Sequence, residues 1–184
     1  MKLILLVTGF LAINACSIIG SHSSNNNCSL GSLSLISGDN QQILVNQSLQ
    51  NDFVIQVKDS CGVVAQDVSV QVTDSLSSSY GQFFSDNNGL VKIAIVAPKK
   101  SGKINLQFSN EKIKDKLLAS FTALAAAPFS LTLLTGSDQS GAVDSLLPQP
   151  ITFKVSDKFL NPISGILVYF DSTGSEGSFL SGSL

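Results

Sequence analysis

The side chains that most often carry chemistry are scarce in this sequence, which has one histidine, His22, three cysteines and two glutamates, Glu111 and Glu176. A serine–histidine–carboxylate triad needs a histidine held against both partners, and His22 lies in a Ser- and Asn-rich stretch that cannot hold it. A zinc site needs three or four ligands at set spacings, and one histidine with scattered cysteines falls short. We therefore expect no catalytic residues, no metal site and no cofactor, and a protein that is not an enzyme.

The first cysteine follows a targeting segment. Lys2 precedes an apolar run from Leu3 to Ile13, which is too short to span a membrane and is typical of a secretory signal. The letters Ile13-Asn14-Ala15-Cys16 resemble a bacterial lipobox, which implies cleavage before Cys16 and lipidation of that cysteine. We expect residues 1–15 to be a lipoprotein signal peptide, with an ordinary signal peptide as the alternative.

Residues 16–32 are rich in Ser, Asn and Gly, and we expect a flexible tether. Ser17 directly after the cysteine resembles an outer-membrane address in Gram-negative lipoproteins. The predicted location is therefore the outer membrane or cell surface, with the membrane bound through lipid on Cys16. The surface of a Gram-positive cell is the alternative.

If Cys16 carries lipid, Cys28 and Cys61 remain for other chemistry. An exported compartment is oxidising and allows a disulfide between them. Cys28 precedes the first predicted strand, and Cys61 lies in a predicted turn. The two Cα atoms must come within about 4.4–6.8 Å for a bridge; otherwise both are free thiols.

The charge pattern speaks against nucleic acid as a partner. The net charge is −2, and all 11 basic residues are lysines without a dense basic face. We interpret the lysines around Lys99–Lys103 and Lys112–Lys116 as solvated turns and a strand edge protected by lysine, with an acidic partner or an anionic surface as the alternative.

Apolar residues alternate with polar ones over most of the chain, as at Phe53, Ile55 and Val57, and this period of two predicts half-buried strands. Turn signals such as DNNG (86–89) separate them. The spacing predicts an all-β fold of antiparallel β-sandwiches. The expected strands are 33–37, 43–46, 52–58, 67–73, 80–84, 89–97, 103–109, 114–124, 129–134, 150–156, 165–170 and 177–181.

The chain repeats itself at an offset of 98 residues. FVIQVKDSCGVV (53–64) corresponds to ITFKVSDKFLNP (151–162), and no gap is needed from Gly38 to Val72. A period near 100 suits tandem domains better than a solenoid. We expect domain 1 over residues 33–126 and an incomplete domain 2 over 127–184.

The stretches GDNQ, VNQSL, FVIQVKDSCGVVAQDVSVQV and SDNNGLVKIAI resemble, in order and spacing, the bacterial Ig-like domain, group 1, of the invasin and intimin type. The resemblance covers about residues 33–184. Pro162 matches a family proline that is Val64 in the first copy. The resemblance implies tandem Ig-like sandwiches that act as a surface spacer or adhesion-related module.

The matched positions have structural explanations. The carboxylate of Asp59, and that of Asp157 in the second copy, can accept backbone N–H groups in a turn. Gly62 and Gly89 suit a positive φ. We therefore expect these four residues to be structural turn residues.

The second copy lacks counterparts of the strands at 89–97, 103–109 and 114–124, so it would expose an apolar face and open edges. Three explanations stay open: a fragment of a longer chain, an interrupted gene, or a strand donor that completes domain 2.

We thus expect a lipid-anchored bacterial surface protein whose Ig-like domains act as a rigid spacer or adhesion-related module. One alternative is a specific ligand-binding module that uses loops of domain 1 to bind a protein or host-surface ligand. Another is the N-terminal part of a longer exported protein with its functional domain beyond Leu184.

Overall fold

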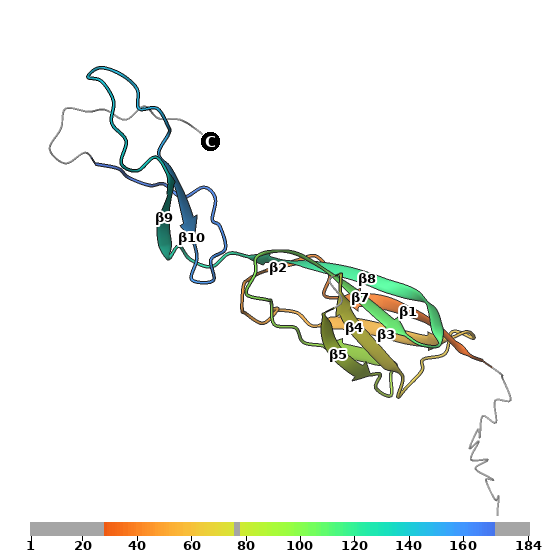
Figure 1. The fold of residues 1–184 in the computed structure, drawn as a ribbon. Coiled ribbons are helices and arrows are strands. Elements are labelled where there is room, and N and C mark those ends of the chain that lie inside the picture. Colours follow the sequence, from red (N-terminus) through yellow and green to blue (C-terminus); the bar gives the residue numbers. More distant parts are fainter. Residues whose placement is uncertain (1–27, 76–77, 172–184) are drawn as a thin grey trace, which may run out of the picture.

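The structure, a computed structural model, describes residues 28–75 and 78–171, and its regular elements there are all β-strands (Figure 1). The prediction of an all-β fold is therefore confirmed. The predicted signal peptide, the lipidation site Cys16 and the predicted strand at 177–181 lie outside the described residues. The strands are β1 (Leu30–Ser37), β2 (Gln41–Leu44), β3 (Phe53–Asp59), β4 (Ser69–Asp74), β5 (Ser79–Phe84), β6 (Leu90–Ile93), β7 (Gly102–Asn110), β8 (Ile113–Leu124), β9 (Ser130–Thr135) and β10 (Thr152–Ser156).

Strands β1 to β8 form two sheets that pack face to face, and we call this unit the N-terminal sandwich. One sheet has the order β1-β3-β6 and the other the order β2-β8-β7-β4-β5. Every second residue of a strand points to the same face, so the predicted alternation becomes a core between the sheets. Phe53 of β3 and Phe108 of β7, both fully buried, bring their ring centroids within 5.7 Å.

One pair departs from the antiparallel expectation, because β2 runs parallel to β8, with Gln41 opposite Phe121. The reason is the path of the chain after β1. Gly38 (φ 104°) and Asn40 (φ 57°) turn the backbone out of the first sheet, and β2 continues in the second. A Cβ at Gly38 would lie 2.7 Å from the Cα of Phe53, so this turn needs glycine.

Two predicted strands depart most from the observed structure. The strand expected at 89–97 ends at Ile93, and residues beyond it bond instead to the segment after β2, with the Leu49 N–H donating to Ile95 O. The strand expected at 165–170 does not form. Its counterpart β4 pairs with β5 and β7, whereas no strand pairs with residues 165–170 among the described residues.

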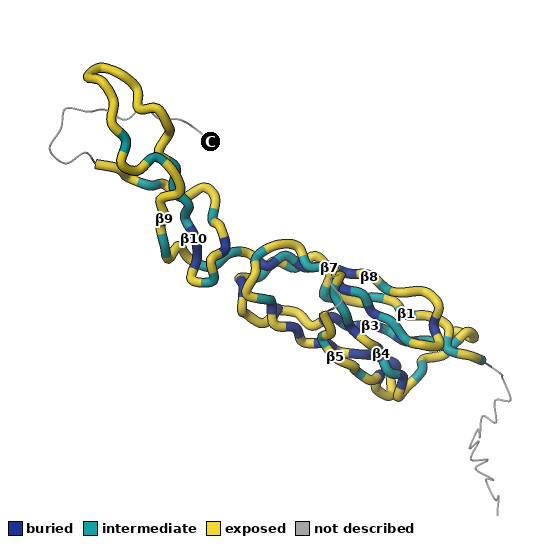
Figure 2. Tube along the Cα trace, in the orientation of Figure 1, coloured by how far each residue is buried: buried dark blue, intermediate teal, exposed yellow. Residues whose placement is uncertain are grey.

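The remaining two strands, β9 and β10, form a separate antiparallel sheet beyond the end of β8. We call residues 127–171 the C-terminal segment. Its pairing register repeats that of β1 and β3 at the offset of 98: Leu33 faces Val57, and Leu131 faces Val155. Figure 2 shows that burial is concentrated in the N-terminal sandwich, while the C-terminal segment is mostly exposed.

Candidate functional site: the junction after the sandwich

A fully buried carboxylate, that of Asp157, lies outside the sandwich core in the turn that follows β10. Asp157 has no exposed surface, and its Oδ1 accepts the backbone N–H groups of Phe159 and Asn161 at 2.8 and 2.9 Å. This arrangement is the Asx-type turn that Asp favours. Leu160 has a positive φ of 68° inside the turn. The turn presents the Asn161 side chain toward the end of the N-terminal sandwich.

Asn161 connects the two parts of the molecule. Its Oδ1 accepts the Ser101 N–H at 2.8 Å, and its Nδ2 donates to Lys99 O at 2.7 Å. The same Nδ2 also donates to Asp157 Oδ2 at 2.9 Å. Asn161 is only 4% exposed. A buried amide whose donor and acceptor are satisfied fixes one geometry, because leaving either atom unpaired costs free energy.

The chain that links the two parts is held by the same turn. Ala126, which follows β8, donates its N–H to Asp157 Oδ2 at 2.9 Å. Ala126 and Phe159 also pack against the apolar core of the sandwich. The linker and the turn are therefore bound to each other as well as to the sandwich.

The hydrogen bonds around Asp157 favour its ionised form. Burial alone would raise the pKa of this carboxyl, but the Asn161 side chain and the N–H groups of Ala126, Asn161 and Phe159 lower the pKa to about 2. The carboxylate is thus charged at neutral pH and can accept all of these donors at once.

The N-terminal sandwich contains the same turn, 98 residues earlier. Asp59 Oδ1 accepts the N–H groups of Cys61 and Val63 at 2.9 and 2.8 Å, and Gly62 has a φ of 82°. Where the second turn holds Ala126 by a hydrogen bond, the first holds the corresponding residue, Cys28, by a disulfide.

This disulfide joins Cys28 and Cys61, with Cα atoms 5.9 Å apart. The corresponding residues of the second turn are Ala126 and Phe159, which do not form a covalent bond. Asn161 corresponds to Val63, which is 59% exposed. The same turn therefore fixes the chain that enters each repeat, by covalent chemistry in the first and by polar contacts in the second.

Gly89, the remaining turn residue singled out from the sequence, lies directly before β6 with a φ of 69°. A Cβ there would be 2.7 Å from Val57 O. Its carbonyl accepts the Val57 N–H at 2.8 Å. The DNNG turn thus docks against β3, far from the junction.

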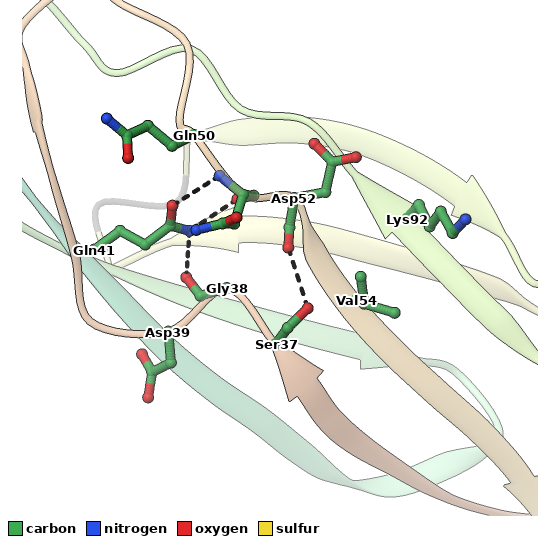
Figure 3. A pocket seen from close by; sticks show the side chains of 9 residues that line it. Ser37, Gly38, Asp39, Gln41, Gln50, Asp52, Val54 and Lys92 are labelled. Carbon is green, nitrogen blue, oxygen red and sulfur yellow. Dashed lines mark hydrogen bonds between the residues drawn. The ribbon is translucent and has the colours of Figure 1, made fainter.

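A hollow of about 480 Å³ lies at the turn between β1 and β2 (Figure 3). Its most prominent polar side chain, Gln41, donates to Gly38 O and Asn51 O and accepts the Asn51 N–H. Gln139 makes the same three bonds in the C-terminal segment. Gln41 is therefore a structural residue of the turn in both repeats.

Sequence reasoning did not identify Asn161. One signal was available: Asn161 corresponds to Val63 and introduces an amide next to Pro162 within an otherwise matched stretch. Its partners, Lys99 and Ser101, belong to the lysine cluster that we interpreted as a solvated turn. The lysine side chains there are exposed, and only the backbone takes part in the junction.

Within residues 28–75 and 78–171, no three His, Cys, Asp or Glu side chains come together in a way that could hold a metal ion. The same residues contain no helix with the length and hydropathy needed to cross a membrane.

Comparisons with known proteins give a likeness to solved structures. No family model and no curated protein matches the sequence. Among solved structures, the chain is similar to domains 4–9 of the surface layer protein SbsC, with 12% identity over 76% of this chain and a TM-score of 0.35. The chain spans about a fifth, 22%, of the length of that structure.

Proposed function

We propose that this chain is a lipid-anchored bacterial surface protein with Ig-like units of the invasin and intimin type, in which the junction holds successive units at a fixed orientation. The membrane end is the lipid on Cys16, followed by the tether, and the stiff part begins at the disulfide between Cys28 and Cys61. The function is mechanical, as a spacer or adhesion-related module, and uses no catalytic residue.

The observation that carries this proposal is the Asp157–Asn161 network. Units connected by a short linker normally move relative to each other unless their interface restricts them. Here Asn161 bonds to the backbone of Lys99 and Ser101, and Asp157 bonds to the linker at Ala126. Backbone partners suit a spacer, because they do not depend on mobile side chains.

The arrangement of strands supports the Ig-like part of the proposal. Ig-like sandwiches pack two antiparallel sheets of about seven strands, and the N-terminal sandwich has a three-stranded and a five-stranded sheet. Both repeats use the same aspartate turn at the same place. If Ig-like units are joined in series, each unit needs a contact that holds the chain entering it, and the aspartate turn provides this contact in both repeats.

The stiffness is tested with Asn161→Ala in the full chain, measured by small-angle X-ray scattering. We expect a broader distribution of interatomic distances than for the unchanged protein, while the thermal unfolding of the sandwich stays the same. Val63→Ala, at the corresponding position of the first turn, is the matched control and should leave the scattering unchanged. Identical scattering for Asn161→Ala and the unchanged protein would rule out a stiffening role.

The anchor is tested separately by the intact mass of the native protein, extracted with detergent from its own membranes. A mass that starts at Cys16 and includes acyl chains supports lipidation. An unmodified mass with another N-terminus would contradict lipidation of Cys16, but it would not affect the proposal that the junction is stiff.

A further inference from the structure

Strand β10 has an open edge where its counterpart β3 has a neighbour. In the N-terminal sandwich, β3 lies between β1 and β6, with Phe53 opposite Ile93 and Ile55 opposite Val91. In the C-terminal segment, β10 pairs with β9 alone among the described residues. The backbone of β10 thus offers a row of hydrogen-bonding groups along one side.

The occupied part of that edge is the same in both repeats. Ala65 donates its N–H to Val57 O beside β3, and Ile163 donates to Val155 O beside β10. In the sandwich, Val57 in turn donates to Gly89 O, where the chain enters β6. The C-terminal segment therefore has the hydrogen bond that precedes the β6 contact in the sandwich, and the rest of the β10 edge corresponds to the part of β3 that β6 covers.

The face next to this edge is apolar and mostly uncovered. Val45 is 3% exposed in the sandwich, whereas its counterpart Val143 is 93% exposed. Leu131 and Leu133 of β9 are 50% and 42% exposed. Phe153 of β10 is half-buried, because the Phe170 ring lies 4.8 Å away, between centroids, and covers one side of it.

We propose that the edge of β10 is a docking site for an extended segment with the chemistry of β6, taken up antiparallel in the register of β3 and β6. The occupant has apolar side chains opposite Ile151 and Phe153 and a polar one opposite Thr152, as Ile93, Val91 and Lys92 are placed in the sandwich. Main-chain hydrogen bonds hold it, and the alternating side chains select it.

A second copy of β10 fits this edge less well than a β6-type segment. Antiparallel pairing of two β10 strands centred on Lys154 would place two ammonium groups directly opposite, which is unfavourable. Pairing centred on Phe153 avoids that clash but joins two sheets that each expose Leu131 and Leu133, so it doubles the uncovered face. A β6-type segment instead reproduces the pairing that the sandwich already uses.

The test uses the chain with residues 86–98 appended after Leu184 through a Gly/Ser linker, which raises the effective concentration of a weak ligand. The amides of Phe153 and Val155 point to the open edge, as that of Val57 points to β6, and their hydrogen exchange should slow about tenfold or more relative to the unextended chain. The matched control carries Val91→Asp and Ile93→Asp in the appended copy alone, and it should give no protection. A synthetic peptide of residues 86–98 added to the unextended chain should protect the same amides.

Three results would overturn the proposal. The first is no protection of β10 in the extended chain. The second is equal protection by the aspartate control, since apolar matching would then be irrelevant. The third is protection in the unextended chain that rises with protein concentration, because the occupant would then be a second copy.

Discussion

The two repeats share their local structure and differ in their burial. Val45 and Val143 each precede a residue with a positive φ near 60°, Asn46 and Asp144, yet their side chains are 3% and 93% exposed. The turns need only a few neighbouring residues, whereas burial needs partners from distant strands. The comparison shows that turns and pairing register are encoded within about 30 residues, while the core depends on β6, β7 and β8.

The largest expected difference between the repeats concerns core aromatic residues. Phe108→Ala removes a fully buried ring from the sandwich, and we expect a loss of about 3–5 kcal/mol in the free energy of unfolding. Phe153→Ala, in half-buried surroundings, should lower it far less. Guanidinium denaturation followed by circular dichroism measures both. Equal losses would mean that the C-terminal segment has a core of its own.

The second difference is the covalent tie. Cys28 and Cys61 close a loop with a sequence separation of 33, and replacing both by serine should destabilise the sandwich by about 2–4 kcal/mol. Thermal melts with and without reductant measure this loss. The double serine variant should no longer respond to reductant. A variant as stable as the unchanged protein would mean that the turn holds the entering chain without the disulfide.

The third prediction compares two turn glycines of the N-terminal sandwich, which differ in the space around a Cβ atom. Gly89→Ala should cost about 2–3 kcal/mol, because its Cβ would lie 2.7 Å from Val57 O in addition to the strain of a positive φ. Gly62→Ala has open space around its Cβ, and its counterpart Leu160 keeps a φ of 68°, so we expect about 1 kcal/mol. Denaturant midpoints of the two variants give the order. The reverse order would contradict the contact-based explanation.

The smallest expected effect is the pH dependence of the junction. The pKa of Asp157 is lowered from its ordinary value of 3.8 to about 2, so its stabilising contribution is present above the unfolded value and is lost as the pH falls through the folded one. We expect the junction to stay ordered from neutral pH to about pH 4 and to loosen toward about pH 2.

The carboxyl chemical shift of Asp157, followed by NMR, measures this titration. Asp157→Asn is the control, because an amide cannot accept the Ala126 N–H with its nitrogen and does not titrate. A midpoint near the ordinary value would show that the hydrogen bonds to Asp157 do not persist in solution.

Much of the fold could be predicted from the chain. Alternation predicted nine of the ten observed strands to within three residues at both ends, and the tenth, β6, was predicted four residues too long. The final strand of the sandwich, β8, was predicted from alternation to within one residue of its observed bounds. Predictions failed where the length or the existence of a strand depends on its pairing partners. Examples are β6, which ends at Ile93, and residues 165–170, where no strand forms.

Of the two main residues of the candidate site, the sequence predicted Asp157 but not Asn161. Asp157 stood out because it matches Asp59, and its turn could be anticipated from the tendency of aspartate to accept nearby N–H groups. Asn161 could not be assigned, because its partners Lys99 and Ser101 lie about 60 residues away. Nothing local distinguishes an amide that bridges two units from one that faces water.

The sequence by itself determined the β-class of this protein, the repeat at 98 residues and the aspartate turns that follow β3 and β10, because these depend on alternation and on short-range hydrogen bonds. Only the tertiary structure decided the parallel pairing of β2 with β8, the joining of Cys28 to Cys61 and the contact of Asn161 with the end of the sandwich. These features bring together residues that are far apart in the chain, and their free energy depends on a geometry that exists only once both sheets have packed.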